Sequence, residues 1–481
     1  MTRLTRAFAV MMVALGSLAL VHRAVALDSC ANHLPKTGPW TGITLTPYSP
    51  QNLNQYICLG SSITFTVTPN DVDAYGEPIP CQDSTPNCKW YVDNVEKGSG
   101  PSYEFTPTAA GTYTVKCEAT DGGDTWQPPP NTPKGYDAPQ SVTWTLYAVG
   151  AEVKAVIFTS DHGVMTDWDS DYAGSGGTVY NPRGWRKTPP ANNPISHTKG
   201  LNISANVVIC VQPAGVSFTL DGDGPVTALD FSAGGQTSTG SDQTISVTST
   251  GPLEAKVYTT GGSIVWTIKD VGGTGGPTVG AGTSGPHTVY VTWDTPADGT
   301  ATVHRIKWVC NKADGQTTKE ACVDAIWHGV AGGTTFGLGP PQTDGWALLD
   351  GGRGDCDNQA RCMSYAVLVL GAGPAEVDYV RASTDEDVSD LETRYCSEDG
   401  EEWLYLDFDP GPGMNRNNYE GCCRTSDPVH WYAITPEIKA DSGFLILCAL
   451  ANEHGVTQWW FWDAYELCTQ DGDEPVNGCP P

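Results

Sequence analysis

Alternating apolar and polar positions dominate the first part of the chain. In residues 63–67, 113–117 and 142–146, every second side chain is apolar or aromatic. A two-residue period places such side chains on one face of a β-strand. Turn-forming residues separate these runs. The pattern predicts an all-β domain over residues 27–150.

The same kind of pattern continues over residues 151–300. Strand-like runs occur at 253–258, 264–268 and 287–293, and a glycine-rich tract at 271–286 separates the last two. Glycine-rich segments behave as flexible connections. We therefore expect a second β-sandwich domain with a glycine-rich insertion.

The period changes in the third region, residues 301–470. Residues 317–320 have the spacing of a capping box, which predicts a short helix after them. Strand patterns return at 375–382, 403–409 and 429–435, and residues 444–451 fit a further helix. Helices followed by antiparallel strands predict an α+β domain. Residues 471–481 form a C-terminal tail.

A second helix is predicted to begin at Cys356 and to end at Gly371. Small or apolar residues recur after Cys356 at three- and four-residue steps and give one buried face, made of Ala360, Met363, Val367 and Leu370. The unpaired N–H groups and the dipole at a helix N-terminus favour a thiolate. Cys356 is therefore a candidate nucleophile.

The spacing around this cysteine resembles the cysteine motif of the transglutaminase-like superfamily. In that motif Gly-x-Cys opens a helix, an alanine follows four residues on, and glycine with Pro-Ala closes it; the matching positions are Gly354, Cys356, Ala360, Gly371, Pro374 and Ala375. The resemblance implies a papain-like thiol domain. It also implies that Cys356 attacks a glutamine carboxamide or peptide carbonyl of an extracellular protein or peptide and forms a thioester, which requires no cofactor.

The first domain resembles the Ig-like and PKD-type sandwich modules of secreted proteins, through residues 89–94 and 103–115. Cys58, Trp90 and Cys117 follow the order of an inter-sheet disulfide with a packed tryptophan. Cys81 and Cys88 are spaced to close a small loop beside it. The fold class is therefore multidomain, with all-β Ig-like sandwiches followed by the α+β transglutaminase-like domain.

A thiol enzyme needs a histidine as base and an acidic or amide side chain to orient it. The third domain offers His328, His430 and His454, and we select His430 because it begins an aromatic strand. Asp409 would orient it if strands 403–409 and 429–435 pair.

Other arrangements remain open for this base. Asp441 or Asp463 is an alternative partner for His430. The family's histidine motif itself looks like residues 413–420, where Met414 takes the place of the expected histidine. The domain is then either active through His430 or a non-catalytic relative that serves in extracellular binding.

The N-terminal 26 residues have the basic, apolar and Ala-x-Ala regions of a secretory signal, which predicts a secreted or cell-surface protein. No later segment is apolar enough for a membrane span. The formal net charge of −29 argues against nucleic acid as a partner, because phosphate binding requires clustered basic residues.

All 16 cysteines follow the signal, so we expect most to be paired in an oxidising compartment. Cys210 is the expected buried unpaired thiol. Cys356 is either a free nucleophile or half of a disulfide, with candidate partners Cys362, Cys396, Cys422 and Cys423. Secretion favours disulfides over a zinc site. The acidic residues at 167–171 are compatible with calcium ligation, but we expect a solvated loop, since the turn glycine of an EF-hand is absent.

Overall fold

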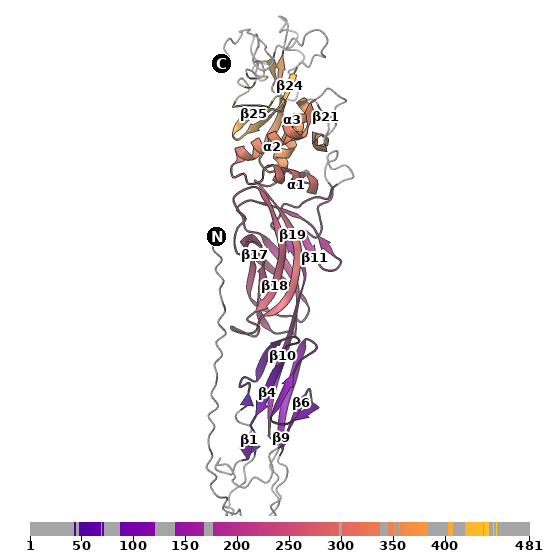
Figure 1. Ribbon diagram of the computed structural model, residues 1–481, viewed down its shortest axis with the longest axis vertical. Coiled ribbons are helices and arrows are strands. Elements are labelled where there is room, and N and C mark those ends of the chain that lie inside the picture. The colour runs from indigo at the N-terminus through magenta and orange to yellow at the C-terminus, as the bar shows by residue number, and fades with distance from the viewer. Residues whose placement is uncertain are drawn as a thin grey trace, which may run out of the picture. The chain divides into compact units, whose positions relative to one another are not determined.

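The computed structural model describes residues 43–44, 48–68, 70–71, 87–120, 140–167, 177–297, 301–336, 345–350, 353–354, 356–382, 403–406, 419–435 and 437–441, with Ile446 and Ala449 (Figure 1). Most described elements are β-strands. The described residues fall into two compact units. The first lies within Met1–Leu53, Thr64–Phe105 and Thr114–Trp144, and the second within Asn54–Ile63, Thr106–Tyr113 and Thr145–Pro481. The protein is thus β-rich and multidomain.

The first unit is built around aromatic side chains. Trp90 stacks on Trp144 at a centroid distance of 5.8 Å, and Phe65 lies 5.0 Å from Trp144. All three are fully buried. The strands found wholly or partly in this unit are β1 (Ile43–Thr44), β2 (Tyr48–Ser49), β4 (Ile63–Val67), β5 (Asn70–Asp71), β6 (Asn87–Val92), β7 (Val95–Ser99), β8 (Ser102–Phe105), β9 (Gly111–Thr120) and the first residues of β10 (Gln140–Phe158).

Strand β10 (Gln140–Phe158) passes through residue 150, where the sequence predicts a domain boundary. Its buried positions alternate along most of its length, which keeps one face apolar. The chain therefore continues as one strand through the predicted boundary. Within this strand the first compact unit ends at Trp144 and the second begins at Thr145.

The second unit contains the predicted second β domain. Its large core includes Phe158, Ile209, Phe231 and Trp266. The strands that enclose this core, besides the C-terminal part of β10, are β3 (Asn54–Cys58), β11 (Gly184–Arg186), β12 (Ala191–Asn192), β13 (Ile195–Thr198), β14 (Ser204–Gln212), β15 (Ser217–Asp223), β16 (Phe231–Thr237), β17 (Asp242–Ser249), β18 (Tyr258–Lys269) and β19 (Val279–Thr292).

The glycine-rich tract is more regular than the sequence predicts. Residues 279–286 belong to β19, which pairs antiparallel with β18. The preceding turn is fixed by Gly272, whose N–H donates to the Ser217 carbonyl at 2.9 Å. Strand pairing satisfies the backbone groups of β19, and this outweighs the flexibility of its glycines.

The α+β region follows in the same unit. A sheet of order β23-β22-β24-β25-β26 packs against helices, with α3, β24 and β25 visible together in Figure 1. The elements are α1 (Val303–Lys312), α2 (Lys319–Gly333), β20 (Thr335–Phe336), the 3-10 helix η3 (Gly345–Asp350), β21 (Arg353–Gly354), α3 (Cys356–Val369), β22 (Ala375–Ala382), β23 (Trp403–Leu406), β24 (Tyr419–Ser426), β25 (Val429–Ala433) and β26 (Ile438–Ala440). None of the described helices is both long and apolar enough to cross a membrane.

Helix α3 confirms the prediction from hydrophobic spacing. It begins at Cys356, and the predicted face is fully buried, at Ala360, Met363, Val367 and Leu370. Gly371 ends it with φ of +73°, and a Cβ atom there would lie 2.2 Å from the Asp294 carbonyl oxygen. Only glycine fits this position without strain.

Several elements of this region are absent from the sequence prediction, and two of them affect the order of the sheet and its cover. Helix α1 and strand β24 are both present, and β24 separates β22 from β25. Strand β23 pairs parallel with β22 at the sheet edge, so the expected all-antiparallel arrangement is wrong there. The predicted pairing of strands 403–409 and 429–435 is therefore wrong, because two strands lie between them.

The core of the second β domain contains a buried polar chain. Trp266 Nε1 donates to Ser284 Oγ at 2.9 Å, and Ser284 Oγ lies 2.9 Å from His287 Nε2. His287 is 3% exposed. Burial lowers its pKa from 6.5 to about 4. The imidazole is therefore neutral in the folded protein at neutral pH.

Because the folded-state pKa of His287 is depressed, its contribution to stability is complete above pH 6.5 and is lost as pH falls toward 4. We expect the titration of this one group to lower the free energy of unfolding by about 3 kcal/mol over that pH window. Urea unfolding from pH 7 to 4.5 measures the loss, and His287→Gln should flatten it. His328→Gln, at an exposed histidine, serves as the control. An identical acid profile in wild type and His287→Gln would contradict the assignment.

Candidate functional site

Cys356 occupies the first position of α3 and is fully buried. Gln359, one turn further on, is also fully buried; its Nε2 donates to Thr334 Oγ1 at 2.8 Å, while its Oε1 accepts no hydrogen bond from the described residues. The positive end of the helix dipole favours the thiolate form of a cysteine at a helix N-terminus, which suits a nucleophile. The described structure, however, closes this sulfur off from solvent.

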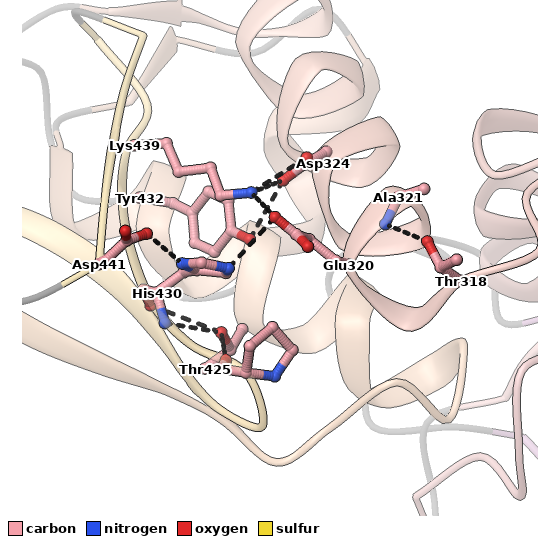
Figure 2. A network of polar contacts seen from close by, with 10 residues as sticks. Thr318, Glu320, Ala321, Asp324, Thr425, His430, Tyr432, Lys439 and Asp441 are labelled. Carbon is pink, nitrogen blue, oxygen red and sulfur yellow. Dashed lines mark hydrogen bonds and ion pairs between the residues drawn. The ribbon is translucent and has the colours of Figure 1, made fainter.

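His430 lies in β25 on the face that α2 covers, and only 11% of its side chain is exposed. Its two ring nitrogens face carboxylates: Nε2 is 3.3 Å from Glu320 Oε1, and Nδ1 is 2.9 Å from Asp441 Oδ1 (Figure 2). Neither contact has hydrogen-bond geometry. The imidazole thus lies between two carboxylates without a hydrogen bond to either.

The residues around His430 form a charged cluster, which we define as Glu320, Asp324, His430, Tyr432, Lys439 and Asp441. Helix α2 begins after Thr318, whose hydroxyl accepts the Ala321 N–H at 3.2 Å. Glu320 and Asp324 are four residues apart and therefore share one face of this helix. The other members come from β25, from β26 and from the residue that follows β26.

Lys439 joins α2 to the sheet edge. Its Nζ donates to Glu320 Oε1 at 2.6 Å and to the two Asp324 oxygens at 2.9 and 3.1 Å. Tyr432 Oη donates to the same Asp324 Oδ1 at 3.1 Å. Figure 2 shows Lys439 and Tyr432 both directed at Asp324. These charge-assisted bonds bind helix and strands together.

The cluster shifts the ionisation of its members. The hydrogen bond from Lys439 is the main cause that lowers the pKa of Glu320. Burial acts to lower the pKa of Lys439, but the bonds to Glu320 and Asp324 outweigh it and the net shift is upward. Burial, followed by the charge of Asp324, raises the pKa of Tyr432. The shifts of Glu320 and Lys439 favour their charged forms at neutral pH, and that of Tyr432 favours the neutral phenol.

The described contacts of His430 do not include Cys356. Ser364 Oγ donates to the Ala375 carbonyl at 2.8 Å, and Ala375, Thr425 and His430 form one row across β22, β24 and β25. Cys356 precedes Ser364 by eight residues, which is about 12 Å along the axis of α3. No hydrogen bond joins either ring nitrogen of His430 to another described residue.

The predicted partners of His430 have different outcomes. Asp409 lies outside the described residues, as do Asp463 and the segment that contains Met414. Two strands, β22 and β24, lie between β25 and β23, the strand before Asp409. Asp441, the alternative partner, does contact His430.

Sequence reasoning missed Glu320, Asp324 and Lys439. The four-residue spacing of the two acids on a predicted helix was a usable signal of a shared face. Their pairing with Lys439 joins residues 115 and 119 positions apart. Local patterns do not encode contacts at that separation.

No metal site emerges among the described residues, where no group of three or more His, Cys, Asp and Glu side chains has suitable geometry. In the charged cluster, the Lys439 ammonium occupies the space between Glu320 and Asp324. Of the acidic loop, Asp167 is described, and its Oδ1 accepts the His304 N–H at the start of α1 at 2.9 Å. Residues 168–171 lie outside the described residues.

A serine–histidine contact in the second β domain has a structural explanation. Ser160 Oγ lies 2.9 Å from His197 Nε2, and His197 Nδ1 lies 3.1 Å from the Thr198 carbonyl oxygen. The carbonyl can only accept, so Nδ1 carries the proton and Ser160 donates to Nε2. Because the Ser204 N–H donates to the same hydroxyl at 2.8 Å, Ser160 serves to join two strands.

Comparisons with known proteins give no family for this chain. No family model matches it, and no curated protein matches it. Solved structures with some likeness include a quinonprotein alcohol dehydrogenase-like protein from Bacteroides thetaiotaomicron, at 11% identity over 44% of each chain and a TM-score of 0.16.

Two further structures match at the same level. Dimeric latent PorU from Porphyromonas gingivalis is 9% identical, over 52% of this chain and 20% of that chain, with a TM-score of 0.16. A mutant of Salmonella alpha-2-macroglobulin is 12% identical, over 54% of this chain and 15% of that chain, also with a TM-score of 0.16. The chain thus spans less than half the length of each of these three structures, and likeness this low carries no argument about its activity.

Lys439→Met tests the charged cluster. Loss of the ammonium leaves Glu320 and Asp324 without their common cation, so we expect the α+β region to lose about 1–2 kcal/mol of stability, a value limited by the partial exposure of both acids. Urea unfolding monitored by far-UV circular dichroism measures it.

Lys319→Met is the matched control on the same helix. The Lys319 Nζ lies 4.0 Å from the carboxylate of Asp427, whose side chain is 89% exposed. Its loss should change stability by less than about 0.5 kcal/mol. Equal effects of the two substitutions would show that the cluster adds nothing beyond surface charge.

Proposed function

We propose that the protein is an extracellular binding protein in which the C-terminal domain is a transglutaminase-like scaffold without catalytic activity. Support for the domain type comes from the Gly354 to Ala375 motif and from a helix that begins at Cys356 and packs on a sheet. The N-terminal β domains supply the binding surfaces in this proposal, and the signal-like segment supports secretion.

One observation carries the proposal: the ring nitrogens of His430 face the carboxylates of Glu320 and Asp441 and make no hydrogen bond to another described residue. A catalytic base must lie within hydrogen-bond reach of the group it deprotonates, at roughly 2.6–3.2 Å. Ser364, which bonds to Ala375 in the row that contains His430, lies about 12 Å from Cys356 along the axis of α3. The contacts with Glu320 and Asp441 give His430 a structural role instead.

A second candidate, a thiol acyltransferase or hydrolase, is favoured by the position of Cys356 at the helix N-terminus. The thiolate would attack a glutamine carboxamide or peptide carbonyl, and the leaving ammonia or amine would take up the thiol proton. Water or an amine would then release the acyl group from the thioester. This route requires a base other than His430 and a movement that exposes the buried sulfur.

Thiol reactivity separates the two candidates. In native, reduced protein we expect iodoacetamide to alkylate Cys356 no faster than the equally buried Cys322. Burial raises the pKa of Cys322 to about 12. Quantitative mass spectrometry of labelled peptides from pH 5 to 9 measures both rates. The same protein should incorporate no fluorescent amine into a glutamine-containing protein.

His430→Gln and Cys356→Ala are the diagnostic variants for this test. The scaffold account is wrong if Cys356 alkylates rapidly below pH 7 and if both variants abolish an amine-incorporation activity of the wild type. A labelling rate for Cys356 that is unchanged in His430→Gln supports the structural role of that histidine.

A further inference from the structure

Two buried thiols meet in the first unit. Cys88 lies in β6 and Cys117 in β9, which pair antiparallel with Cys88 opposite Ala119 and Trp90 opposite Cys117. The two cysteines are therefore diagonal neighbours on one face of the sheet. A side-chain hydrogen bond joins their sulfurs, and they are 3% and 0% exposed.

The arrangement differs from both pairings that the sequence suggests. Cys58 would pair with Cys117 across two sheets, but its thiol donates to the Thr278 carbonyl at 3.1 Å. Cys81, the suggested partner of Cys88, lies outside the described residues. No disulfide is formed among the cysteines at 58, 88, 117, 210, 310 and 322.

We propose that Cys88 and Cys117 form a disulfide that joins β6 to β9 beside Trp90. The paired strands β6 and β9 hold the two hydrogen-bonded thiols on one face, and the bond would close a loop across β7 and β8. Such a bond restricts the unfolded chain. It would hold the strand that carries Trp90, whose Nε1 donates to the Gly100 carbonyl at 2.8 Å within the same loop.

The bond forms by thiol–disulfide exchange with a small-molecule or protein disulfide as the oxidant. One cysteine thiolate attacks that disulfide, gives a mixed disulfide and releases one thiol. The second cysteine then attacks the mixed disulfide and releases the other thiol, so two protein thiols are oxidised and one external disulfide is reduced to two thiols.

Burial decides when this reaction takes place. It raises the pKa of both thiols, so few thiolates exist once the unit has folded. The bond therefore forms during folding and is afterwards protected from reductants by the same burial. Refolding under oxidising conditions is the appropriate experiment.

The test begins with full-length, reduced and denatured protein, refolded with reduced and oxidised glutathione. Acid quench, alkylation with N-ethylmaleimide in guanidinium and digestion with trypsin and endoproteinase Asp-N follow. Cleavage before Asp83 and after Lys116 separates Cys81, Cys88 and Cys117. We expect a cross-linked peptide pair that contains Cys88 and Cys117. Two alkylated thiols, or a cross-link from either cysteine to Cys58 or Cys81, would overturn the proposal.

Thermal unfolding gives an independent readout. Reductant present throughout refolding should lower the midpoint temperature of thermal unfolding of the first unit by on the order of 10 °C. Cys88→Ala and Cys117→Ala should each lower it similarly and make it insensitive to reductant. Cys210→Ala, at a half-buried thiol of the second unit, is the control and should keep the reductant effect. A wild-type transition that ignores reductant contradicts the proposal, whatever the state of Cys356.

Discussion

The packing of α3 against the sheet is the constraint on which the C-terminal region depends. The buried face of the helix shares one core with Cys423 and Tyr432 of the sheet. Ser364 adds a hydrogen bond to the Ala375 carbonyl that fixes the helix along the strands. Once this interface is set, the position of every candidate side chain follows from its place along α3 or from its row in the sheet. Cys356 opens α3, whereas His430 lies in the row that contains Ala375 and Thr425.

The charged cluster shows how a histidine that suits catalysis can serve the fold. Two carboxylates face His430, and Lys439 joins α2 to the sheet edge beside it. Burying a polar imidazole costs free energy, and the charged neighbours in this cluster reduce that cost. The ring nitrogens of His430 make no hydrogen bond to another described residue. Aromatic side chains complete the environment, with Tyr432 at 6.1 Å from His430 and 5.5 Å from Trp327 between ring centroids.

Sequence periodicity predicted elements better than it predicted their neighbours. Helix α3 and strand β22 have the expected limits because a three-to-four-residue period and a short apolar run with turn residues are local properties. Strand β24 was missed, since Cys422 and Cys423 hide its alternation, and the order of the sheet was consequently wrong. His430 was correctly identified as a strand residue, but its contacts with Glu320 and Asp441 depend on that order. Asp441 was an alternative that spacing could not rank above Asp409.

An experimental structure of the full-length protein tests the central claim most directly, through the distance between Cys356 Sγ and the nearer ring nitrogen of His430. The account predicts a separation on the order of 10 Å or more, with the His430 ring between Glu320 and Asp441. A distance within about 4 Å, with a path for a proton from sulfur to imidazole, would contradict it and would restore the thiol-enzyme interpretation.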